Sequence, residues 1–335
     1  MKIFRTALFL SFTALFLACH PASIQSTFVP RIDLPSRCEI IFSGDFMQHL
    51  PQVSAAQRDT GFDYLSSLKT IIPYWKSADF AVINLETTLS PTPPYTGYPM
   101  FRSPSAIAGA LKQAGITHVA LANNHAMDKG LLGARFTIEA LQRAGLGYCG
   151  VRLANDGRAE LMYLCKNKFK IAILNYTYST NGMPVPRGVQ LNMIDTVLIK
   201  GDIALARGEG ASHIVAFFHW GDEYSVRASR AQQELAAWCR VGGVNVVVGS
   251  HPHVVQQIDP AGQTIYSLGN FVSNQRERYK NGGISVRVTF YEGFDRATFA
   301  FLPHAVGPTY NIILPGQDSS NLSHADSRRA VNASL

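Results

Sequence analysis

The sequence predicts a layered α/β domain built around a largely parallel sheet. Short apolar runs alternate with segments of helical hydrophobic spacing along most of the 335 residues, and this alternation is typical of strands joined by helices. Hydrophobic residues make up 47% of the chain, which is enough for a large core and too much for a disordered protein. No internal repeat and no break in composition interrupts the pattern, so we expect one domain over residues 37–303.

The N-terminus has the form of an export signal. A cationic start, Met1–Arg5, precedes the apolar stretch Thr6–Leu17, which is too short to span a bilayer. The stretch ends at Ala18 and Cys19, as in bacterial lipoprotein signals whose cysteine is acylated, although cleavage a few residues later is an alternative. We predict a signal peptide over residues 1–19, lipidation of Cys19, and export to the bacterial cell envelope with attachment to a membrane through a lipid anchor only.

The segments on either side of the domain lack hydrophobic periodicity. Residues 20–36 carry prolines among polar residues and are predicted to be a linker. Residues 304–335 form a C-terminal extension that is rich in serine, asparagine and aspartate beyond Pro315, and we predict a disordered tail there.

Charge and cysteine content narrow the class of protein. The formal net charge of +7 is scattered and contains no block of Lys and Arg, so it fits an anionic ligand or an envelope surface, and no nucleic acid is expected. Export permits disulfides, but the remaining cysteines have no C-x-x-C spacing, and we expect isolated buried thiols. These cysteines are Cys38, Cys149, Cys165 and Cys239.

The first half of the domain contains three predicted strands and three predicted helices. The strands are apolar runs over Cys38–Ser43, Asp79–Ile83 and His118–Ala122. Helical spacing of apolar residues predicts helices over Phe62–Trp75, Ser103–Ala114 and Leu131–Ala144. The stretch Pro91–Pro104 is rich in Pro, Tyr and Gly without a helical period, and we predict a binding loop.

The second half continues the alternation. Strands are predicted over Lys170–Asn175, His213–Phe218, Val244–Val248 and Thr264–Ser267. Helices are predicted between them over Ile194–Arg207 and Ala228–Val241. Gly283–Phe290 alternates between apolar and polar residues, which indicates a strand in a more antiparallel setting.

Five of these strands are followed by residues that can bind a metal. Each residue alone is a weak signal, because an Asp after a strand is often a turn residue and a lone Glu is usually solvated. The carboxyl ends of parallel strands share one edge of a sheet, so together these residues indicate a site. They are Asp45 with His49, Glu86, Asn124 with His125, His219, and His251 with His253.

The mixture of side chains indicates the kind of metal. Imidazole with carboxylate and amide oxygens suits Zn²⁺, Mn²⁺ or Fe²⁺, whereas a thiolate zinc site or a calcium site needs other ligands. The set is larger than one tetrahedral ion requires. Two ions about 3.5–4 Å apart would use all of it, with Glu86 between them and an acidified water as nucleophile. We therefore expect one or two divalent ions, with Mn, Zn, Fe and Mg left open.

Six short motifs occur between residues 39 and 274. They are G-D-F-M from Gly44, N-L-E from Asn84, N-N-H-A-M-D from Asn123, H-W-G from His219, G-S-H-P-H-V-V-Q from Gly249 and Y-S-L-G-N-F from Tyr266. Together they resemble the CapA (PgsA) family of capsule synthesis, which is linked to poly-γ-glutamate capsules and belongs to the calcineurin-like metallophosphoesterase superfamily. The resemblance implies a four-layer α/β/β/α sandwich, in which two mixed sheets pack face to face with helices outside.

The resemblance also implies roles for individual residues. His125 matches a histidine that binds no metal and assists the leaving group. The implied metal ligands are Asp45, a bridging Glu86, Asn124, His219, and the pair His251 and His253, each facing a different ion.

Two positions depart from the superfamily pattern. Its first motif is D-x-H, and here Met47 stands at the third position. A thioether does not suit a hard, oxygen-rich site, so the ion beside His253 lacks one histidine ligand; His49 is a substitute with a different spacing. Ala126 follows His125 where an acidic residue is usual, and Asp128 is a candidate to orient the imidazole instead.

Two classes of function follow. The first is a metal-dependent, phosphoesterase-like hydrolase of an anionic substrate, in which Arg102 and Arg276 neutralise substrate charge or, alternatively, are merely solvated. The second is a non-enzymatic envelope component that binds, anchors or exports an anionic capsular polymer. A metal-binding remnant that scaffolds a membrane complex is a third possibility. Because no segment spans the membrane, any synthase or channel of a membrane-bound capsule synthesis machinery would be a partner.

Overall fold

The structure, a computed structural model, describes residues 35–154 and 161–316. The predicted signal peptide with Cys19, most of the predicted linker and the end of the C-terminal extension lie outside the described residues. Within the described ranges, no helix is long and apolar enough to cross a bilayer.

The larger of two main sheets has eight strands and mixed direction. Its order is β20-β19-β18-β1-β4-β7-β8, and β17 pairs with β1. The parallel strands are β1 (Arg37–Phe46), β4 (Phe80–Leu85), β7 (His118–Ala120), β8 (Gly147–Cys149) and β17 (Asn270–Val272). The antiparallel strands are β18 (Gly282–Tyr291), β19 (Thr298–Val306) and β20 (Ile312–Ile313).

The second main sheet has six strands in the order β10-β11-β13-β14-β16-β15. Its four central strands run parallel and are β11 (Phe169–Thr177), β13 (His213–His219), β14 (Val246–Ser250) and β16 (Thr264–Ile265). The antiparallel edges are β10 (Met162–Lys166) and β15 (Ile258–Asp259). Smaller two-stranded sheets join β2 (Gln57–Arg58) to β3 (Gly61–Phe62), β5 (Thr88–Ser90) to β6 (Arg102–Pro104), and β9 (Val151–Leu153) to β12 (Val189–Leu191).

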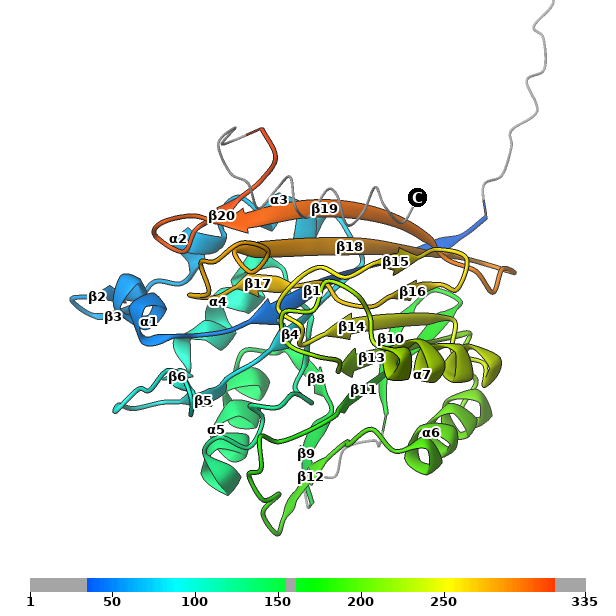
Figure 1. The fold of residues 1–335 in the computed structure, drawn as a ribbon, viewed down its shortest axis with the longest axis horizontal. Coiled ribbons are helices and arrows are strands. Elements are labelled where there is room, and N and C mark those ends of the chain that lie inside the picture. The colour runs from blue at the N-terminus through cyan, green and yellow to red at the C-terminus, as the bar shows by residue number, and fades with distance from the viewer. Residues whose placement is uncertain (1–34, 155–160, 317–335) are drawn as a thin grey trace, which may run out of the picture. The chain divides into compact units, whose positions relative to one another are not determined.

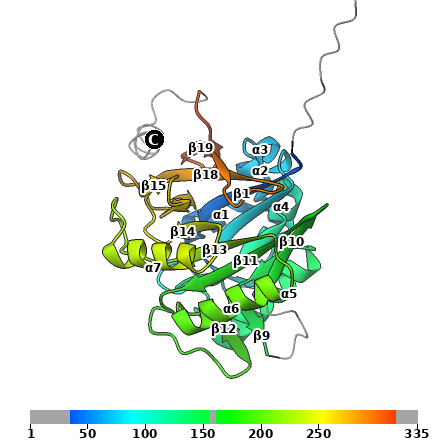
Figure 2. The ribbon, with the colours of Figure 1, turned by 90° about the vertical axis from the view of Figure 1, so that its right-hand side faces the viewer.

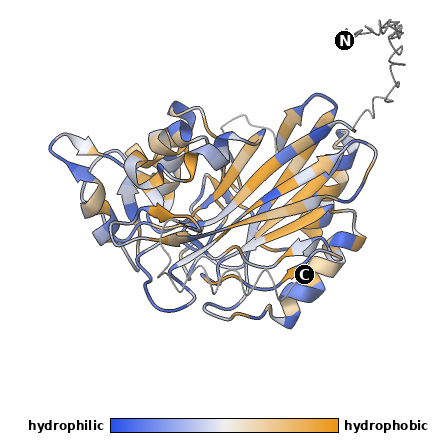
Figure 3. Ribbon diagram, turned by 90° about the horizontal axis from the view of Figure 1, so that it is seen from above, coloured by the Kyte–Doolittle hydropathy of each residue, from blue (hydrophilic) through white to orange (hydrophobic). Residues whose placement is uncertain are grey.

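Alternation along the strands shows that the two main sheets pack face to face. Successive residues of a strand point to opposite faces. Ile40 and Phe42 of β1 share one buried cluster with Val215 and Phe217 of β13, and the rings of Phe42 and Phe217 meet edge to face with centroids 5.8 Å apart. Ile41, between the first two, belongs to a different cluster on the outer side. Figure 3 shows hydrophobic residues along much of the length of the strands.

Helices cover the two outer faces. The outer face of the larger sheet packs against α2 (Leu65–Leu68), α3 (Ile72–Lys76), α4 (Ala106–Ala114) and α5 (Gly130–Arg143). The outer face of the smaller sheet packs against α6 (Thr196–Gly208) and α7 (Arg230–Val241), which lie together on one side in Figures 1 and 2. A short helix, α1 (Leu50–Ala56), follows β1. The order helix, sheet, sheet, helix confirms the predicted four-layer α/β/β/α sandwich.

Two details of the sequence interpretation differ from the structure. The single helix predicted over Phe62–Trp75 is wrong: α2 and α3 are separate, because Pro73 has no N–H to donate and its ring would clash with the preceding turn. Pro303, the predicted end of the domain, lies inside β19, and β20 follows it in the same sheet.

The four described cysteines form no disulfide with one another, as expected for isolated thiols. Three are buried, but Cys165 on the edge strand β10 is exposed, so the expectation of burial was wrong there.

Candidate metal centre

Five strand ends from two sheets meet at the candidate site. The larger sheet contributes Asp45 near the end of β1, Glu86 directly after β4, and Asn124 after β7. The smaller sheet contributes the histidines, with His219 as the last residue of β13 and the His251–His253 loop directly after β14. The expectation that all five share the edge of one sheet was therefore wrong. Instead, the face-to-face packing brings the carboxyl ends of strands from both sheets to the same side, where the candidate residues meet.

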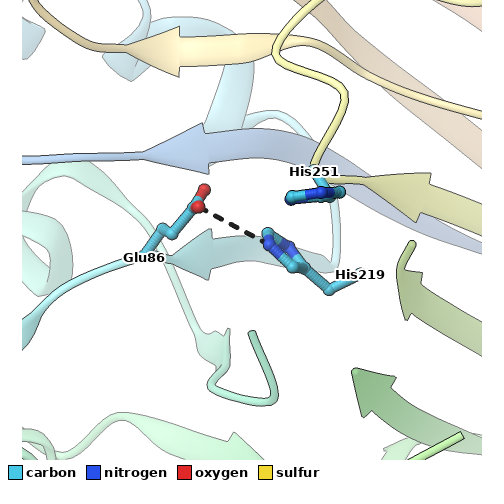
Figure 4. Close-up of side chains that lie close together, drawn as sticks. All are labelled: Glu86, His219 and His251. Atoms are coloured by element: carbon cyan, nitrogen blue, oxygen red, sulfur yellow. Dashed lines mark ion pairs between the residues drawn. The ribbon is translucent and has the colours of Figure 1, made fainter. Parts of the chain in front are cut away.

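The carboxylates and imidazoles form two groups that share Glu86. One group holds Glu86, His219 and His251, and the other holds Asp45, Glu86 and His253, with the ligand atoms of each group within 4.8 Å of one another. Glu86 Oε1 lies 3.5 Å from His219 Nε2 and 3.9 Å from His253 Nε2. Figure 4 shows the Glu86 carboxylate pointing toward His219, with His251 alongside. Glu86 thus lies where a carboxylate shared by two ions would have to be.

Unpaired polar atoms at this place fit a bound cation. Glu86 is completely buried, yet neither of its carboxylate oxygens has a hydrogen-bond partner. Nδ1 of the buried His251 also lacks one. A buried carboxylate without a partner is costly. A divalent ion would supply the missing interactions, so the residues present fit the metal that the sequence predicts.

Outer hydrogen bonds orient the histidines. Ser250 Oγ lies 3.0 Å from His219 Nδ1, and Asn270 Oδ1 lies 3.0 Å from His253 Nδ1. These contacts leave Nε2 of each ring facing Glu86, which is the arrangement by which proteins aim a histidine at a metal. On the same ring edge, Asn124 Oδ1 lies 2.9 Å from His219 Nε2, which places the amide next to the His219 group.

The backbone of the His251–His253 loop is unusual. His251 has φ 99° and His253 has φ 58°, on either side of Pro252. Left-handed backbone is costly for residues with a side chain and is retained where the surroundings impose it. Here Asp45 Oδ2 accepts a hydrogen bond from the amide of His251 at 3.2 Å, so the loop is held against β1.

Burial and mutual charge set the protonation of these groups. Burial, followed by the nearby Asp45 carboxylate, raises the pKa of Glu86 to about 8. Burial lowers the pKa of His219 to about 3, so the contact of His219 with Glu86 is not an ion pair at neutral pH. Burial alone would raise the pKa of Asp45. The hydrogen bond and the attraction from His253 outweigh burial and lower this pKa to about 2. His219 is consequently neutral, the form in which imidazole binds metals.

His125 lies beside these groups with its own acidic partner. Its Nδ1 is 2.8 Å from Asp128 Oδ2, and the same oxygen accepts a hydrogen bond from the amide of Phe101 at 2.6 Å. The Phe101 ring meets the His125 ring edge to face, with centroids 4.7 Å apart. Asp128 is therefore in contact with the imidazole that the sequence interpretation expected it to orient, and both side chains are buried.

A family comparison identifies the domain that carries this centre. The model of the bacterial capsule synthesis protein PGA_cap family matches residues 39–275, which include every residue of the two ligand groups.

The chain belongs to the PGA_cap family.

Two curated relatives have names that agree with the PGA_cap assignment. The capsule biosynthesis protein CapA of Bacillus anthracis is 36% identical over 174 residues, which cover 50% of this chain and 42% of the relative. The PGA biosynthesis protein CapA of Bacillus subtilis (strain 168) is 30% identical over 179 residues, which cover 49% of this chain and 44% of the relative. The match thus spans less than half the length of either relative.

Solved structures share the fold of this PGA_cap protein. The calcineurin-like phosphoesterase YfkN of Bacillus subtilis superposes with a TM-score of 0.51 at 13% identity, over 88% of this chain and 96% of that chain. The NAD nucleotidase NadN of Haemophilus influenzae gives a TM-score of 0.51 at 14% identity, over 90% of this chain and 56% of that chain. The predicted metallophosphoesterase fold is confirmed by these similarities.

His49 does not take the place of the missing histidine ligand in this structure. Its Nδ1 accepts a hydrogen bond from the amide of Asn274 at 3.3 Å and lies 3.1 Å from Gln52 Oε1. Among the described residues, no group of possible ligands includes His49. Met47 is buried, with 2% of its surface exposed.

The two candidate substrate arginines make contacts within the protein. Arg102 donates to the carbonyl of Pro94 at 3.0 Å. Arg276 donates to the carbonyls of Val306 and Gly307 at 3.0 and 3.1 Å, and its guanidinium stacks 4.4 Å from the centre of the Tyr310 ring. Their role in substrate binding stays a prediction.

The sequence interpretation missed one residue that lies near the histidine pair. Glu223 forms a third group of possible ligands with His251 and His253. It follows His219 by four positions in a loop of no regular structure, so no strand end indicated it. Ser250 and Asn270, which contact the Nδ1 atoms of His219 and His253, were also missed, although both lie within the motifs on which the family resemblance rests.

Proposed function

We propose that this PGA_cap protein is a divalent-metal-dependent hydrolase of a phosphoester or a related linkage in an anionic substrate of capsule synthesis. The observation that carries the proposal is the buried, unpaired Glu86 carboxylate shared by two groups of ligands. Two-metal hydrolysis uses two adjacent ions, which two ligand groups that share a carboxylate would hold.

The proposal assigns the ligands to two ions. One ion would be held by Glu86, Asn124, His219 and His251, and the other by Asp45, Glu86 and His253. When bound, the ions would supply an acidified water as nucleophile and stabilise charge on the group under attack.

The remaining chemistry belongs to the protein side chains. Asp128 holds Nδ1 of His125 at 2.8 Å, so Nε2 is the nitrogen left to give a proton to the leaving group. Phe101 packs against the His125 ring and restricts its rotation.

A second function is supported by one observation. Met47 leaves the Asp45 group one histidine short of the superfamily pattern, which favours a non-enzymatic protein that binds, anchors or exports an anionic capsular polymer. Under either function we propose an exported protein, lipidated at Cys19, that works with membrane-bound partners of capsule synthesis. The names of the two Bacillus relatives support a role in capsule formation.

Metal content and phosphodiesterase activity test the proposal together. We expect purified wild-type protein to contain a divalent transition metal and to hydrolyse bis(p-nitrophenyl) phosphate. His251→Ala should lose metal and reduce the rate by more than about 100-fold, because removing a ligand costs more than the ~10–100-fold of removing its outer partner. His118→Ala is the matched control, because His118 begins β7 outside all ligand groups of the described residues.

The outcome separates the two functions. Equal rates in wild type and His251→Ala would contradict the hydrolase. Bound metal without hydrolysis, together with binding of poly-γ-glutamate that the His251→Ala variant loses, would support the polymer-binding function instead.

A further inference from the structure

The loop after β13 is fixed to the His251–His253 loop by its backbone. The amide of Trp220 donates to the carbonyl of Ser250 at 3.0 Å, and the amide of Tyr224 donates to the carbonyl of Pro252 at 2.8 Å. Pro252 lies between the two histidines. The second bond therefore holds Glu223, which precedes Tyr224, next to both imidazoles.

Further contacts make this arrangement rigid. Tyr224 has φ 66°, a left-handed conformation that a tyrosine adopts only where its surroundings impose it. Its ring lies 6.0 Å from the ring of His253, and Lys280 Nζ lies 4.3 Å from the same tyrosine ring. Gln256 Nε2 donates to the carbonyl of Ser225 at 2.9 Å on the far side of the loop.

Glu223 differs from the other acids of the site by its exposure. Asp45 and Glu86 are completely buried, whereas Glu223 is exposed. A carboxylate oxygen of Glu223 nevertheless lies within 4.8 Å of ring nitrogens of His251 and His253. It therefore faces the two imidazoles from the solvent side.

We propose that Glu223 is a metal ligand that closes the solvent side of the centre, together with His251 and His253. His251 and His253 are assigned to different ions, so Glu223 would add a carboxylate to a centre that already holds imidazole ligands. Carboxylate together with imidazole suits a divalent transition metal such as Mn²⁺, Fe²⁺ or Zn²⁺. This inference rests on the proposed metal dependence of the site. The proposed ligand comes from the loop after β13, four positions beyond His219.

The neighbouring Asp222 provides a matched control. It is also acidic and exposed and lies in the same loop, but it belongs to none of the ligand groups found among the described residues. If negative charge near the site only attracts the ion, neutralising either residue should weaken metal binding. If Glu223 coordinates the ion, only the Glu223 variant should show a large loss of binding.

The test is titration of the metal-free full chain with Mn²⁺, followed by calorimetry and by the electron paramagnetic resonance of bound Mn²⁺. We expect Glu223→Gln to weaken binding of at least one ion tenfold or more and to change the spectrum of the bound ion. Asp222→Asn should match wild type in both measurements. Circular dichroism would show whether each variant keeps the fold.

Two results would overturn the inference, and they are distinguishable. If wild type binds Mn²⁺ and folded Glu223→Gln binds it with equal affinity and an unchanged spectrum, Glu223 is not a ligand, while the proposed function stands. If wild type binds no Mn²⁺, Zn²⁺ or Fe²⁺, both the inference and the metal-dependent function fail.

Discussion

At the scale of single residues, Glu86 makes the metal-free protein sensitive to pH. Burial raises its pKa to about 8, whereas an unfolded glutamic acid has a value near 4.5. Attraction to Glu86 and Asp45 outweighs burial and raises the pKa of His253 to about 9 from 6.5. The two groups are coupled, because only an ionised Glu86 attracts a protonated His253. Between pH 6.5 and 8 the folded pair therefore retains at least one proton that the unfolded state has released.

Because the pKa values of Glu86 and His253 are higher in the folded than in the unfolded state, we predict that the metal-free protein becomes less stable as pH rises from 6.5 to 8. Stability falls with pH wherever the folded state binds more protons, and one proton over this interval corresponds to roughly 2 kcal/mol of unfolding free energy. Glu86→Gln should flatten the decline. Urea unfolding of chelator-treated protein at several pH values measures how the unfolding free energy changes with pH. The same decline in wild type and in Glu86→Gln would contradict the role of Glu86.

The contact between His125 and Asp128 predicts a leaving-group effect. Asp128→Asn keeps the acceptor for the Phe101 amide but weakens the hold on His125 Nδ1. Hydrolysis of a phosphodiester with a poor leaving group should fall about 10- to 100-fold, a part of the ~10²–10⁴ that general acid catalysis contributes. The p-nitrophenyl ester should be affected less, since its leaving group needs little protonation.

Metal content and parallel kinetics check this prediction. Asp128→Asn should contain as much metal as wild type, and His125→Ala should show the same dependence on the leaving group. An equal loss with both esters would mean that Asp128 acts on the fold of the site and not on proton transfer.

At the scale of elements, two glycines allow the strand ends to converge. A Cβ atom on Gly44 would lie 2.0 Å from the carbonyl oxygen of Gly269, and one on Gly249 would lie 2.0 Å from that of Tyr266. Both contacts are with backbone, which cannot rotate away. These glycines precede Asp45 and the His251–His253 loop, so they permit the close approach that assembles the ligands.

Gly249→Ala is therefore expected to destabilise the fold by about 3 kcal/mol or more, the upper range for overpacking. Gly201→Ala is the control, because nothing lies within 4 Å of a Cβ at that position in α6. It should instead stabilise the protein by about 0.5–1 kcal/mol through lower entropy of the unfolded chain. Urea unfolding at constant pH compares the free energies of unfolding of Gly249→Ala and Gly201→Ala. A similar decrease in both variants would exclude the steric explanation.

Periodicity predicted most of the central elements, and its errors have physical causes. β1, β11, β13 and β14 are long apolar runs whose burial on both sides leaves a clear signal. The helix over Phe62–Trp75 failed because apolar spacing continues through Pro73, which a helix tolerates only in its first turn, and here Pro73 lies in the first turn of α3. Glu223 was missed because its position depends on the bond from Tyr224 to Pro252, a contact between distant parts of the chain that no local pattern reveals.

At the scale of the whole domain, the candidate centre joins the two sheets. Asp45, Glu86 and Asn124 come from the larger sheet, and the candidate histidine ligands come from the smaller one. The alternating strands and helices predicted a layered α/β domain, and the family resemblance implied two packed sheets, but neither showed which strands share a sheet. That assignment depends on inter-sheet contacts such as the one between Phe42 and Phe217.

Because the ligands come from both sheets, bound metal should stabilise the sandwich. We expect Mn²⁺ at 100 times its dissociation constant to add about 2.7 kcal/mol to the unfolding free energy. A chelator should remove this gain, and His251→Ala should show little of it. Thermal unfolding with and without Mn²⁺ measures the effect, and an equal shift in His251→Ala would mean that the ion binds elsewhere.

The distance along the chain between the ligands has a practical consequence. Asp45 and His253 are the first and last residues of the two groups that share Glu86, and they lie on different sheets, so they come together only when both sheets are formed and packed. A chain that stops early, or whose two sheets have not docked, cannot assemble either group. The metal content per chain of a preparation would therefore measure the fraction of molecules that have reached the native state, and could be used to compare the folding of variants without an activity assay.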